Sequence, residues 1–189
     1  MTYIDYVHIT DEDLVRLYLA TRDKGYFGEL YRRFSPKVYA KCITILKSKE
    51  RAEDATQDIF VKVALKISNF RLDSRFSTWI YSITYHYCID ELRKSKKQQP
   101  IENIALLESD INLIEVDDRF LLEIELNRLA DILNEIPIND KIILMMKYMD
   151  EVSIKELAAI MDKSESAIKM KLKRAKMKFK KIYIHKYHN

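Results

Sequence analysis

The strongest hydrophobic pattern in the chain begins at Ser153 and predicts two helices joined by a tight turn. Ser153 and Glu156 have the spacing of a capping box, which marks the start of a helix. The apolar positions of this first helix share one face: Ile154, Leu157, Ala158 and Met161. Asp162 and Lys163 interrupt the pattern, and Ser164 is a suitable N-cap for the second helix. The segment therefore has the order of a helix-turn-helix.

The second of these helices combines an apolar face with a dense positive charge. Its apolar positions alternate at steps of four and three: Ile168, Leu172, Ala175, Phe179 and Ile182. Its remaining faces carry basic residues: Lys169, Lys171, Lys173, Arg174, Lys176, Lys178, Lys180 and Lys181. Residues 163–189 hold ten Lys or Arg and one acid, whereas the whole chain has a net charge of +4, so the rest of the chain is acidic. A basic helix after a tight turn is typical of a recognition helix in the major groove of DNA, and a solvated amphipathic helix is the alternative.

The N-terminal half of the chain predicts four further helices, over residues of about 10–24, 26–46, 52–67 and 78–94. Thr10 and Asp13 form a second capping signature, and Pro36 is a potential bend in the second helix. The third helix has an apolar stripe, made of Ala55, Ile59, Val63 and Ile67. Its other side carries polar residues: Glu53, Asp54, Gln57 and Asp58. Residues 69–77, NFRLDSRFS, are polar and aromatic, and we predict that they form a loop.

The composition favours an all-helical protein without a membrane span. Apolar residues make up 48% of the chain, and its 2 Gly and 3 Pro are too few to build many tight β-turns. No apolar run of about 18 residues is present, so no membrane insertion is expected. Cys42 and Cys88 lie far apart among apolar helical positions, which predicts core packing rather than a zinc site or a disulfide framework. The acidic N-terminus lacks the features of a signal peptide, so we expect a cytoplasmic protein.

An acidic stretch divides the chain into two predicted domains. From residue 98 to residue 118 there are six acids and no Lys or Arg, and helical periodicity is weak. A loop of this length is uncommon within a compact domain, although one domain with a long loop is the alternative. We therefore expect two small helical domains and a flexible acidic linker, with these bounds: 1–96 for the first domain, 97–118 for the linker and 119–189 for the second domain.

Five segments, in their order and spacing, resemble a bacterial RNA polymerase sigma factor of the extracytoplasmic-function (ECF) group. They are YRRFSPKVY (31–39), DATQDIF (54–60), FSTWIYSI (76–83), IDELRKS (89–95) and the C-terminal helix-turn-helix. This group has only sigma domains 2 and 4, which would be a four-helix bundle and the helix-turn-helix. The resemblance implies a protein without catalytic residues or cofactors that binds core RNA polymerase and directs promoter-specific transcription initiation. It also implies control by an anti-sigma factor and by a stress or envelope signal.

The resemblance implies a polymerase-binding surface on the third helix. The matching residues are Glu53, Asp54, Gln57 and Asp58. In the family the partner of this helix is the clamp coiled coil of the largest polymerase subunit. The flap region of the polymerase is a second contact of the sigma factor. An acidic patch on a protein that works on DNA fits a basic protein partner, and an ordinary solvated helix face is the alternative.

The resemblance also implies that the segment 69–77 captures an unstacked base of the proximal (−10) promoter element. The matching residues are Asn69, Phe70, Arg71, Asp73, Ser74 and Ser77, together with Arg93 and Lys94 of the next helix. Phe70 offers a stacking surface, polar side chains can read a base edge, and the two basic residues can hold phosphate. Core packing is the alternative for Phe70 and the favoured role for Phe76 and Trp79.

In the second domain, the resemblance implies contacts to the distal (−35) promoter element. The matching residues are Ser166, Lys169, Met170, Lys171, Lys173 and Arg174. The second domain departs from the family at three places, with Ser166 and Ala167 for the usual Gly-Thr, Lys171 for Arg, and Asp162 for the turn Gly, and the first domain has His86 where the family commonly has Asn. Lys does not make the bidentate contact to guanine that Arg makes. The promoter sequence is therefore not predicted from these residues.

Three other classes of protein are alternatives. A helix-turn-helix regulator that acts without polymerase would need a dimerisation surface and two half-sites, and the N-terminal segments argue against it. An anti-sigma or adaptor protein would carry a zinc-type signature that this sequence lacks. A phosphodiester enzyme would need paired carboxylates at metal-binding spacing beside the basic patch. Comigration with core polymerase distinguishes a sigma factor from an independent regulator.

Overall fold

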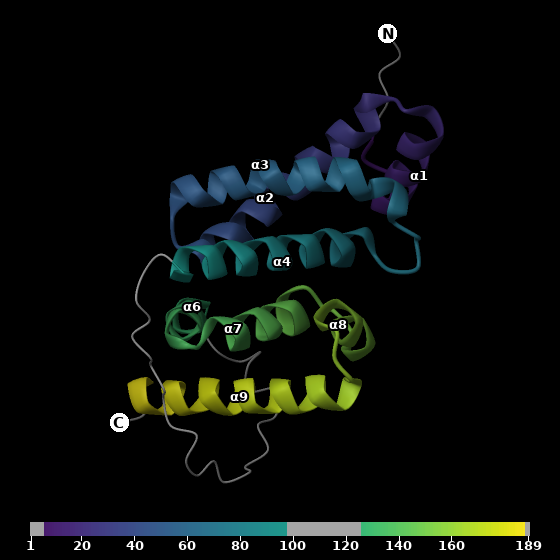
Figure 1. The fold of residues 1–189 in the computed structure, drawn as a ribbon. Coiled ribbons are helices and arrows are strands. Elements are labelled where there is room, and N and C mark those ends of the chain that lie inside the picture. The colour runs from purple at the N-terminus through teal and green to yellow at the C-terminus, as the bar shows by residue number, and fades with distance from the viewer. Residues whose placement is uncertain (1–5, 98–125, 188–189) are drawn as a thin grey trace. The chain divides into compact units, whose positions relative to one another are not determined.

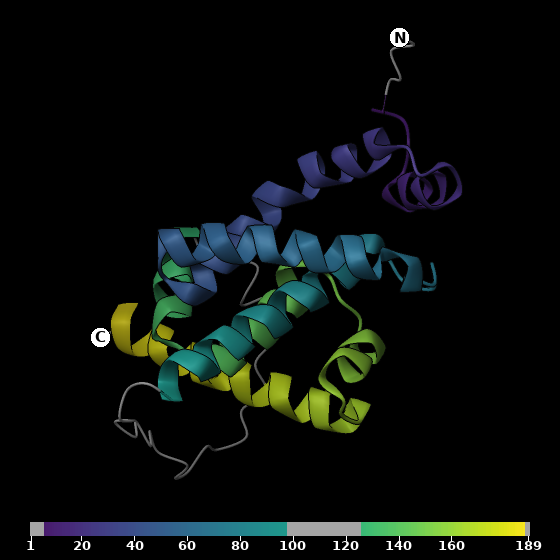
Figure 2. The ribbon, with the colours of Figure 1, turned by 45° about the horizontal axis from the view of Figure 1, so that its top comes forward.

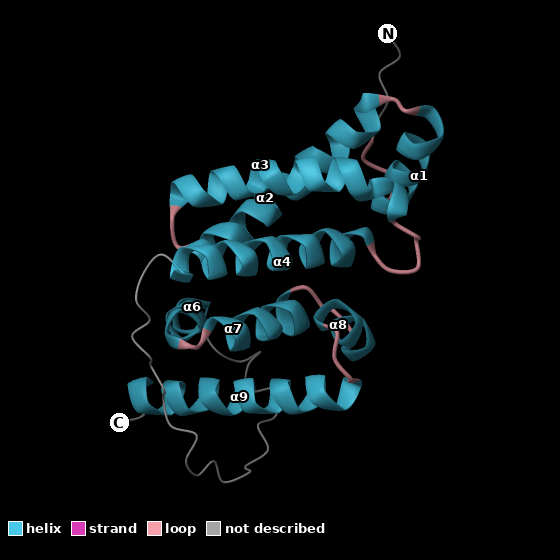
Figure 3. Ribbon diagram, in the orientation of Figure 1, coloured by secondary structure: helices cyan, strands magenta, loops and turns pink. Residues whose placement is uncertain are grey.

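The computed structural model describes residues 6–97 and 126–187, and the chain divides into two compact units, residues 1–101 and 102–189. Within the described ranges all regular structure is helical, as predicted (Figure 3). None of the described helices is both long enough and apolar enough to cross a membrane. The predicted acidic linker, apart from Lys97, lies outside the described residues, as do residues 119–125.

The first unit is a bundle of four helices, as the sequence predicts. They are α1 (Asp11–Thr21), α2 (Lys24–Leu46), α3 (Lys49–Lys66) and α4 (Phe76–Lys97), with a single 3-10 turn, η1 (Ile67–Asn69), after α3. Helix α2 contacts each of the other three helices. Figure 1 shows α3 and α4 beside α2, and Figure 2 shows α1 at the N-terminal end of α2.

Side-chain caps set the starts of these helices. Thr10 caps α1 by accepting a hydrogen bond from the Asp13 amide at 3.1 Å, as predicted. The first helix ends at Thr21 and not near residue 24, because Arg22 adopts a left-handed conformation (φ 58°) and Asp23 already caps α2. Helix α2 continues through Pro36 and ends at Leu46, the end that the sequence predicted.

Helices α2, α3 and α4 enclose the core of the first unit. The predicted stripe of α3 is buried throughout: Ala55, Ile59, Val63 and Ile67. Cys42 of α2 and Cys88 of α4 are both fully buried and form no disulfide, which confirms their predicted role in core packing. Their sulfur atoms lie 3.7 Å apart, a proximity that the sequence did not predict.

A partly buried ion-pair network ties α1 to α2. The Arg33 guanidinium donates hydrogen bonds to the Glu29 carboxylate and to the Asp11 carboxylate, both at 2.7 Å. It also donates to the backbone carbonyl oxygens of Ile9 and Tyr6, at 2.9 and 2.6 Å. One side chain thus holds the segment before α1, the first turn of α1 and the middle of α2 together.

The second unit is built around one long helix. It contains α6 (Leu126–Glu135), α7 (Ile138–Leu144), a π-helical turn η2 (Met145–Met149), α8 (Ile154–Met161) and α9 (Glu165–Tyr187). Helix α9 contacts α6, α7 and α8 (Figure 1). Its buried residues are four of the five predicted apolar positions: Ile168, Leu172, Ala175 and Phe179. Lys178 of α9 also pairs with the buried Asp140 of α7 at 2.8 Å.

Candidate functional site

One face of α3 presents the predicted acidic patch to solvent. Its four residues are all exposed: Glu53, Asp54, Gln57 and Asp58. They are exposed because the opposite face of the helix is the buried stripe that packs on α2 and α4. The carboxylates therefore stand clear of the core, on a rigid helix, where a second protein can reach them.

Two apolar side chains extend this face, and the sequence analysis missed them. Val61 and Leu65 are 58% and 75% exposed, although both belong to residue types that are usually buried. They follow Asp54 and Asp58 at helical spacing, so the face is acidic in its first half and apolar in its second. The sequence did contain a signal of this exposure, because both residues fall outside the i, i+4 stripe that fills the core.

Tyr87 of α4 holds one of these carboxylates in place. Its hydroxyl donates a hydrogen bond of 2.5 Å to Asp58, and the Lys62 ammonium lies 4.6 Å from the centre of its ring. Burial and the bond to Asp58 together raise the pKa of the Tyr87 hydroxyl, so it remains a donor. Sequence reasoning missed this contact because the two residues are 29 positions apart.

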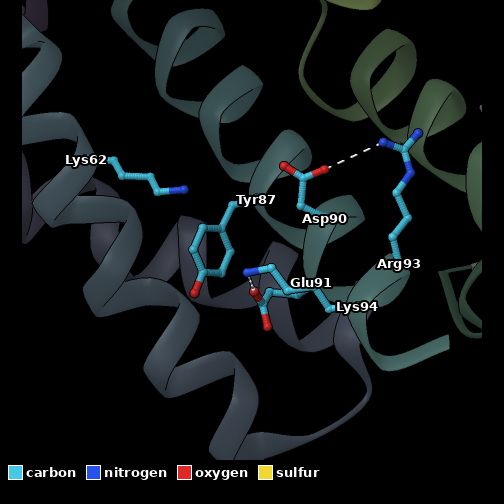
Figure 4. Close-up of a pocket in the computed structure, with 6 residues that line it drawn as sticks. All are labelled: Lys62, Tyr87, Asp90, Glu91, Arg93 and Lys94. Atoms are coloured by element: carbon cyan, nitrogen blue, oxygen red, sulfur yellow. Dashed lines mark hydrogen bonds and ion pairs between the residues drawn. The ribbon is translucent and has the colours of Figure 1, made fainter. Parts of the chain in front are cut away.

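Tyr87 and Lys62 line a shallow hollow with residues from the C-terminal half of α4 (Figure 4). The predicted phosphate-binding residues Arg93 and Lys94 are exposed at its rim. Arg93 pairs with Asp90 at 3.6 Å and Lys94 with Glu91 at 2.8 Å. Because such exposed pairs are weak, a DNA phosphate can compete with the acids for both cations.

The segment predicted as a loop over 69–77 is shorter in the structure. Asn69 closes η1, and α4 already begins at Phe76, so residues 70–75 form the loop. Leu72 has a φ of 59°, a conformation that is uncommon for a side chain of this kind and costs roughly 1–2 kcal/mol. Four of the predicted base-reading residues border or lie in this loop: Asn69, Arg71 and Asp73, which are exposed, and Ser74, which is half-buried. Ser77 lies in the first turn of α4 and is half-buried.

The predicted stacking role of Phe70 has no support from its position. Phe70 is only 5% exposed, and its ring centre lies 5.6 Å from that of Phe76 and 5.4 Å from that of Trp79. Phe76 is fully buried, and its ring contacts Phe34 of α2 as well. The alternative of core packing therefore describes Phe70 in this conformation, because its ring packs against other aromatic rings.

The helix-turn-helix has the predicted caps. The Ser153 hydroxyl accepts from the Glu156 amide at 3.2 Å and the Glu156 carboxylate accepts from the Ser153 amide at 2.9 Å, which completes the capping box. Ser164 caps α9 by accepting from the Ala167 amide at 3.2 Å. Between the helices Asp162 takes the left-handed conformation (φ 50°) that Gly adopts without strain. The turn therefore forms although its usual Gly is absent.

The predicted DNA-facing residues of α9 divide into two groups. Ser166, Lys169, Met170 and Arg174 are exposed, whereas Lys171 and Lys173 are half-buried. Burial lowers the pKa of Lys171, the nearby Lys163 adds to this effect, and Asp140 opposes it. Lys171 thus lies toward the packed side of the helix, and the exposed group forms the accessible basic face.

Two family matches cover most of the described residues. Residues 30–98 match sigma-70 region 2, and residues 126–179 match sigma-70, region 4. The chain belongs to the sigma-70 family. Relatives place this sigma factor in the ECF group. It is 23% identical to the "ECF RNA polymerase sigma factor SigW" of Bacillus subtilis over 84% of this chain and 89% of the relative. It is 27% identical to the "ECF RNA polymerase sigma factor SigM" of the same organism over 82% of this chain and 93% of the relative.

Solved structures share the fold of this sigma factor. CnrH, solved in complex with the cytosolic domain of CnrY, aligns with a TM-score of 0.64 at 18% identity, over 93% of this chain and 98% of that one. The sigma factor RpoE of Bartonella quintana, solved with the anti-sigma factor NepR, aligns with a TM-score of 0.63 at 19% identity, over 87% of this chain and 99% of that one.

Proposed function

We propose that this ECF sigma factor binds core RNA polymerase through the exposed face of α3 and directs initiation at promoters contacted by two of its surfaces. The first surface is residues 69–77 with the end of α4, for the proximal element. The second is the exposed face of α9, for the distal element. The observation that carries the proposal is the separation of charge between two rigid helices: exposed carboxylates on α3 and exposed cations on α9.

The opposite charges of the two faces suit different partners. The carboxylates of α3 repel DNA phosphate and attract a basic protein surface, such as the clamp coiled coil of the largest polymerase subunit. The cations of α9 attract phosphate, and the helix-turn-helix frame orients them toward a major groove. A contact of the second unit with the polymerase flap region would bring both promoter-binding surfaces to one enzyme.

The role is non-enzymatic, and it belongs in the cytoplasm, where core polymerase works. Of the two solved structures that share this fold, RpoE is bound to the anti-sigma factor NepR, and CnrH is bound to the cytosolic domain of CnrY. We infer that this protein likewise has an anti-sigma factor, which releases it in response to a stress or envelope signal. A helix-turn-helix regulator without polymerase binding is disfavoured, since the chain matches sigma-70 region 2 as well as the region 4 that holds the helix-turn-helix.

Run-off transcription tests the proposal. Core polymerase, with and without this protein, transcribes a library of genomic promoters, and start sites are mapped. We expect discrete start sites only when the protein is present. Equal initiation with and without the protein contradicts the proposal, and promoter binding by the protein without core polymerase favours the independent regulator.

A further inference from the structure

Met170 is an apolar side chain in the middle of a charged surface. It is 48% exposed and lies in the second turn of α9, between Lys169 and the cations Lys173 and Arg174. The buried face of α9 lies on the far side of the helix from Met170. The fold therefore gives no packing reason for a large apolar residue at this position.

The position of Met170 suits contact with bases. A recognition helix brings the residues of its first turns to the base edges, while flanking cations hold the phosphates on either side. Met170 lies one turn after the exposed Ser166 and one turn before the exposed Arg174. If the cations bind phosphate, Met170 is the side chain that points between them into the groove.

The chemistry of Met170 restricts what it can recognise there. Its thioether cannot donate a hydrogen bond and accepts one only weakly. The major groove offers one apolar group, the 5-methyl group of thymine, and apolar side chains recognise thymine through it. A flexible thioether adapts its shape to such a group better than a branched side chain does.

We propose that Met170 contacts the 5-methyl group of one thymine in the distal promoter element and selects for an A·T pair at that position. This inference rests on the proposed function, because it requires that α9 bind the distal element. It adds a specificity-determining residue that acts by apolar contact, beside basic residues that act on phosphates.

Replacement of thymine by deoxyuridine tests the contact directly, because it removes the methyl group and keeps the base pair. The assay measures binding of the holoenzyme to a duplex promoter found by run-off transcription, with each thymine of the distal element replaced in turn. We expect wild-type affinity to fall about three- to fivefold at one position, the loss that burial of one methyl group predicts. In Met170→Ala the thymine promoter binds as weakly as the deoxyuridine promoter, so the sensitivity at that position disappears.

Two variants serve as controls. Met149→Ala removes a methionine of similar exposure (58%) outside α9, and it should leave both affinity and deoxyuridine sensitivity unchanged. Lys169→Ala should weaken binding to matched and scrambled distal elements alike and lower the salt dependence, while the sensitivity to deoxyuridine persists.

The outcomes separate this inference from the proposed function. If no replacement matters, if Met170→Ala stays as sensitive as wild type, or if the distal element has no A·T pair, the thymine contact is wrong. The proposed function stands in those cases as long as scrambling the distal element still weakens binding. If scrambling has no effect on wild-type holoenzyme, α9 does not read DNA, and both the thymine contact and the proposed contact of α9 with the distal element fail, while the run-off result still decides whether the protein directs initiation.

Discussion

Glu29 pairs with Arg33, the side chain that joins α1 to α2. Its side chain is nearly buried, and it accepts hydrogen bonds from both Arg32 and Arg33 at 2.7–2.8 Å. The hydrogen bond from Arg32 is the largest cause that lowers the pKa of Glu29 to about 2, with Arg33 acting in the same direction and burial opposing both. The ionised carboxylate is therefore the form that the folded first unit stabilises.

We predict that Glu29→Gln lowers the free energy of unfolding of the first unit by about 1–3 kcal/mol near neutral pH. Because folding lowers this pKa from 4.5 to about 2, the advantage of wild type is present above about pH 4.5. It is lost as the pH falls toward about 2, since both states then bind the proton. Urea denaturation followed by circular dichroism at several pH values measures the difference.

Asp13→Asn is the matched control for Glu29→Gln, because it makes the same chemical change in a solvent-exposed pair with Arg16. Exposed ion pairs contribute little to stability, so the free energy of unfolding of this variant should be close to that of wild type. A difference between wild type and Glu29→Gln that does not vary with pH would show that lost packing, and not lost charge, causes the destabilisation.

At the scale of elements, α3 has one face that packs in the core and a second, exposed face that we propose for polymerase binding. Its buried stripe packs against α2 and α4, while its exposed face carries Asp54 and Asp58 followed by Val61 and Leu65. Surface substitutions on the exposed face should therefore change binding and leave the stability of the fold nearly intact. This separation lets the proposed polymerase contact be tested on a folded protein.

We predict that Asp54→Lys combined with Asp58→Lys weakens binding to core polymerase at least about tenfold, since each lost interfacial pair costs on the order of 1–3 kcal/mol. Fluorescence anisotropy with labelled protein measures the affinity, and circular dichroism should show unchanged helicity. The double variant Asp54→Asn with Asp58→Asn keeps the shape and removes only the charge, so it should lose less. Wild-type affinity in the lysine variant would mean that this face does not contact polymerase.

At the scale of the whole molecule, each unit has a core of its own. Phe34 and Phe76 lie in the interior of the first unit, and Ile132 and Phe179 in that of the second. Each core is closed by helices of the same unit, with α2 at the centre of one and α9 along the other. The two units can therefore lose stability separately.

We predict that Phe179→Ala destabilises the second unit by about 3–5 kcal/mol, because it leaves a large cavity against α9. Hydrogen exchange measured by mass spectrometry should show lost protection in α6–α9 and unchanged protection in α1–α4. An equal loss of protection in both units would contradict the prediction and indicate a single cooperative core.

Local chemistry made much of this protein predictable. The capping box at Ser153, the cap at Thr10 and the buried stripe of α9 depend on residues within a turn or two of one another, so their spacing in the sequence already specifies them. The exposure of the acidic face of α3 follows in the same way from the apolar stripe on its other side. The order and spacing of the five sequence segments then indicated the sigma-factor family.

Only the tertiary structure decided which distant residues meet. The approach of Cys42 to Cys88 and the bond from Tyr87 to Asp58 join residues of different helices, and the burial of Phe70 places a loop residue against Trp79 of α4. A sequence pattern specifies which face of a helix is apolar, but it does not specify the register at which two helices pack. Packing placed Phe70 in an aromatic cluster, whereas the exposure of Met170 follows from its position opposite the buried face of α9. The faces of the helices were determined by the sequence itself, and the contacts between helices by packing.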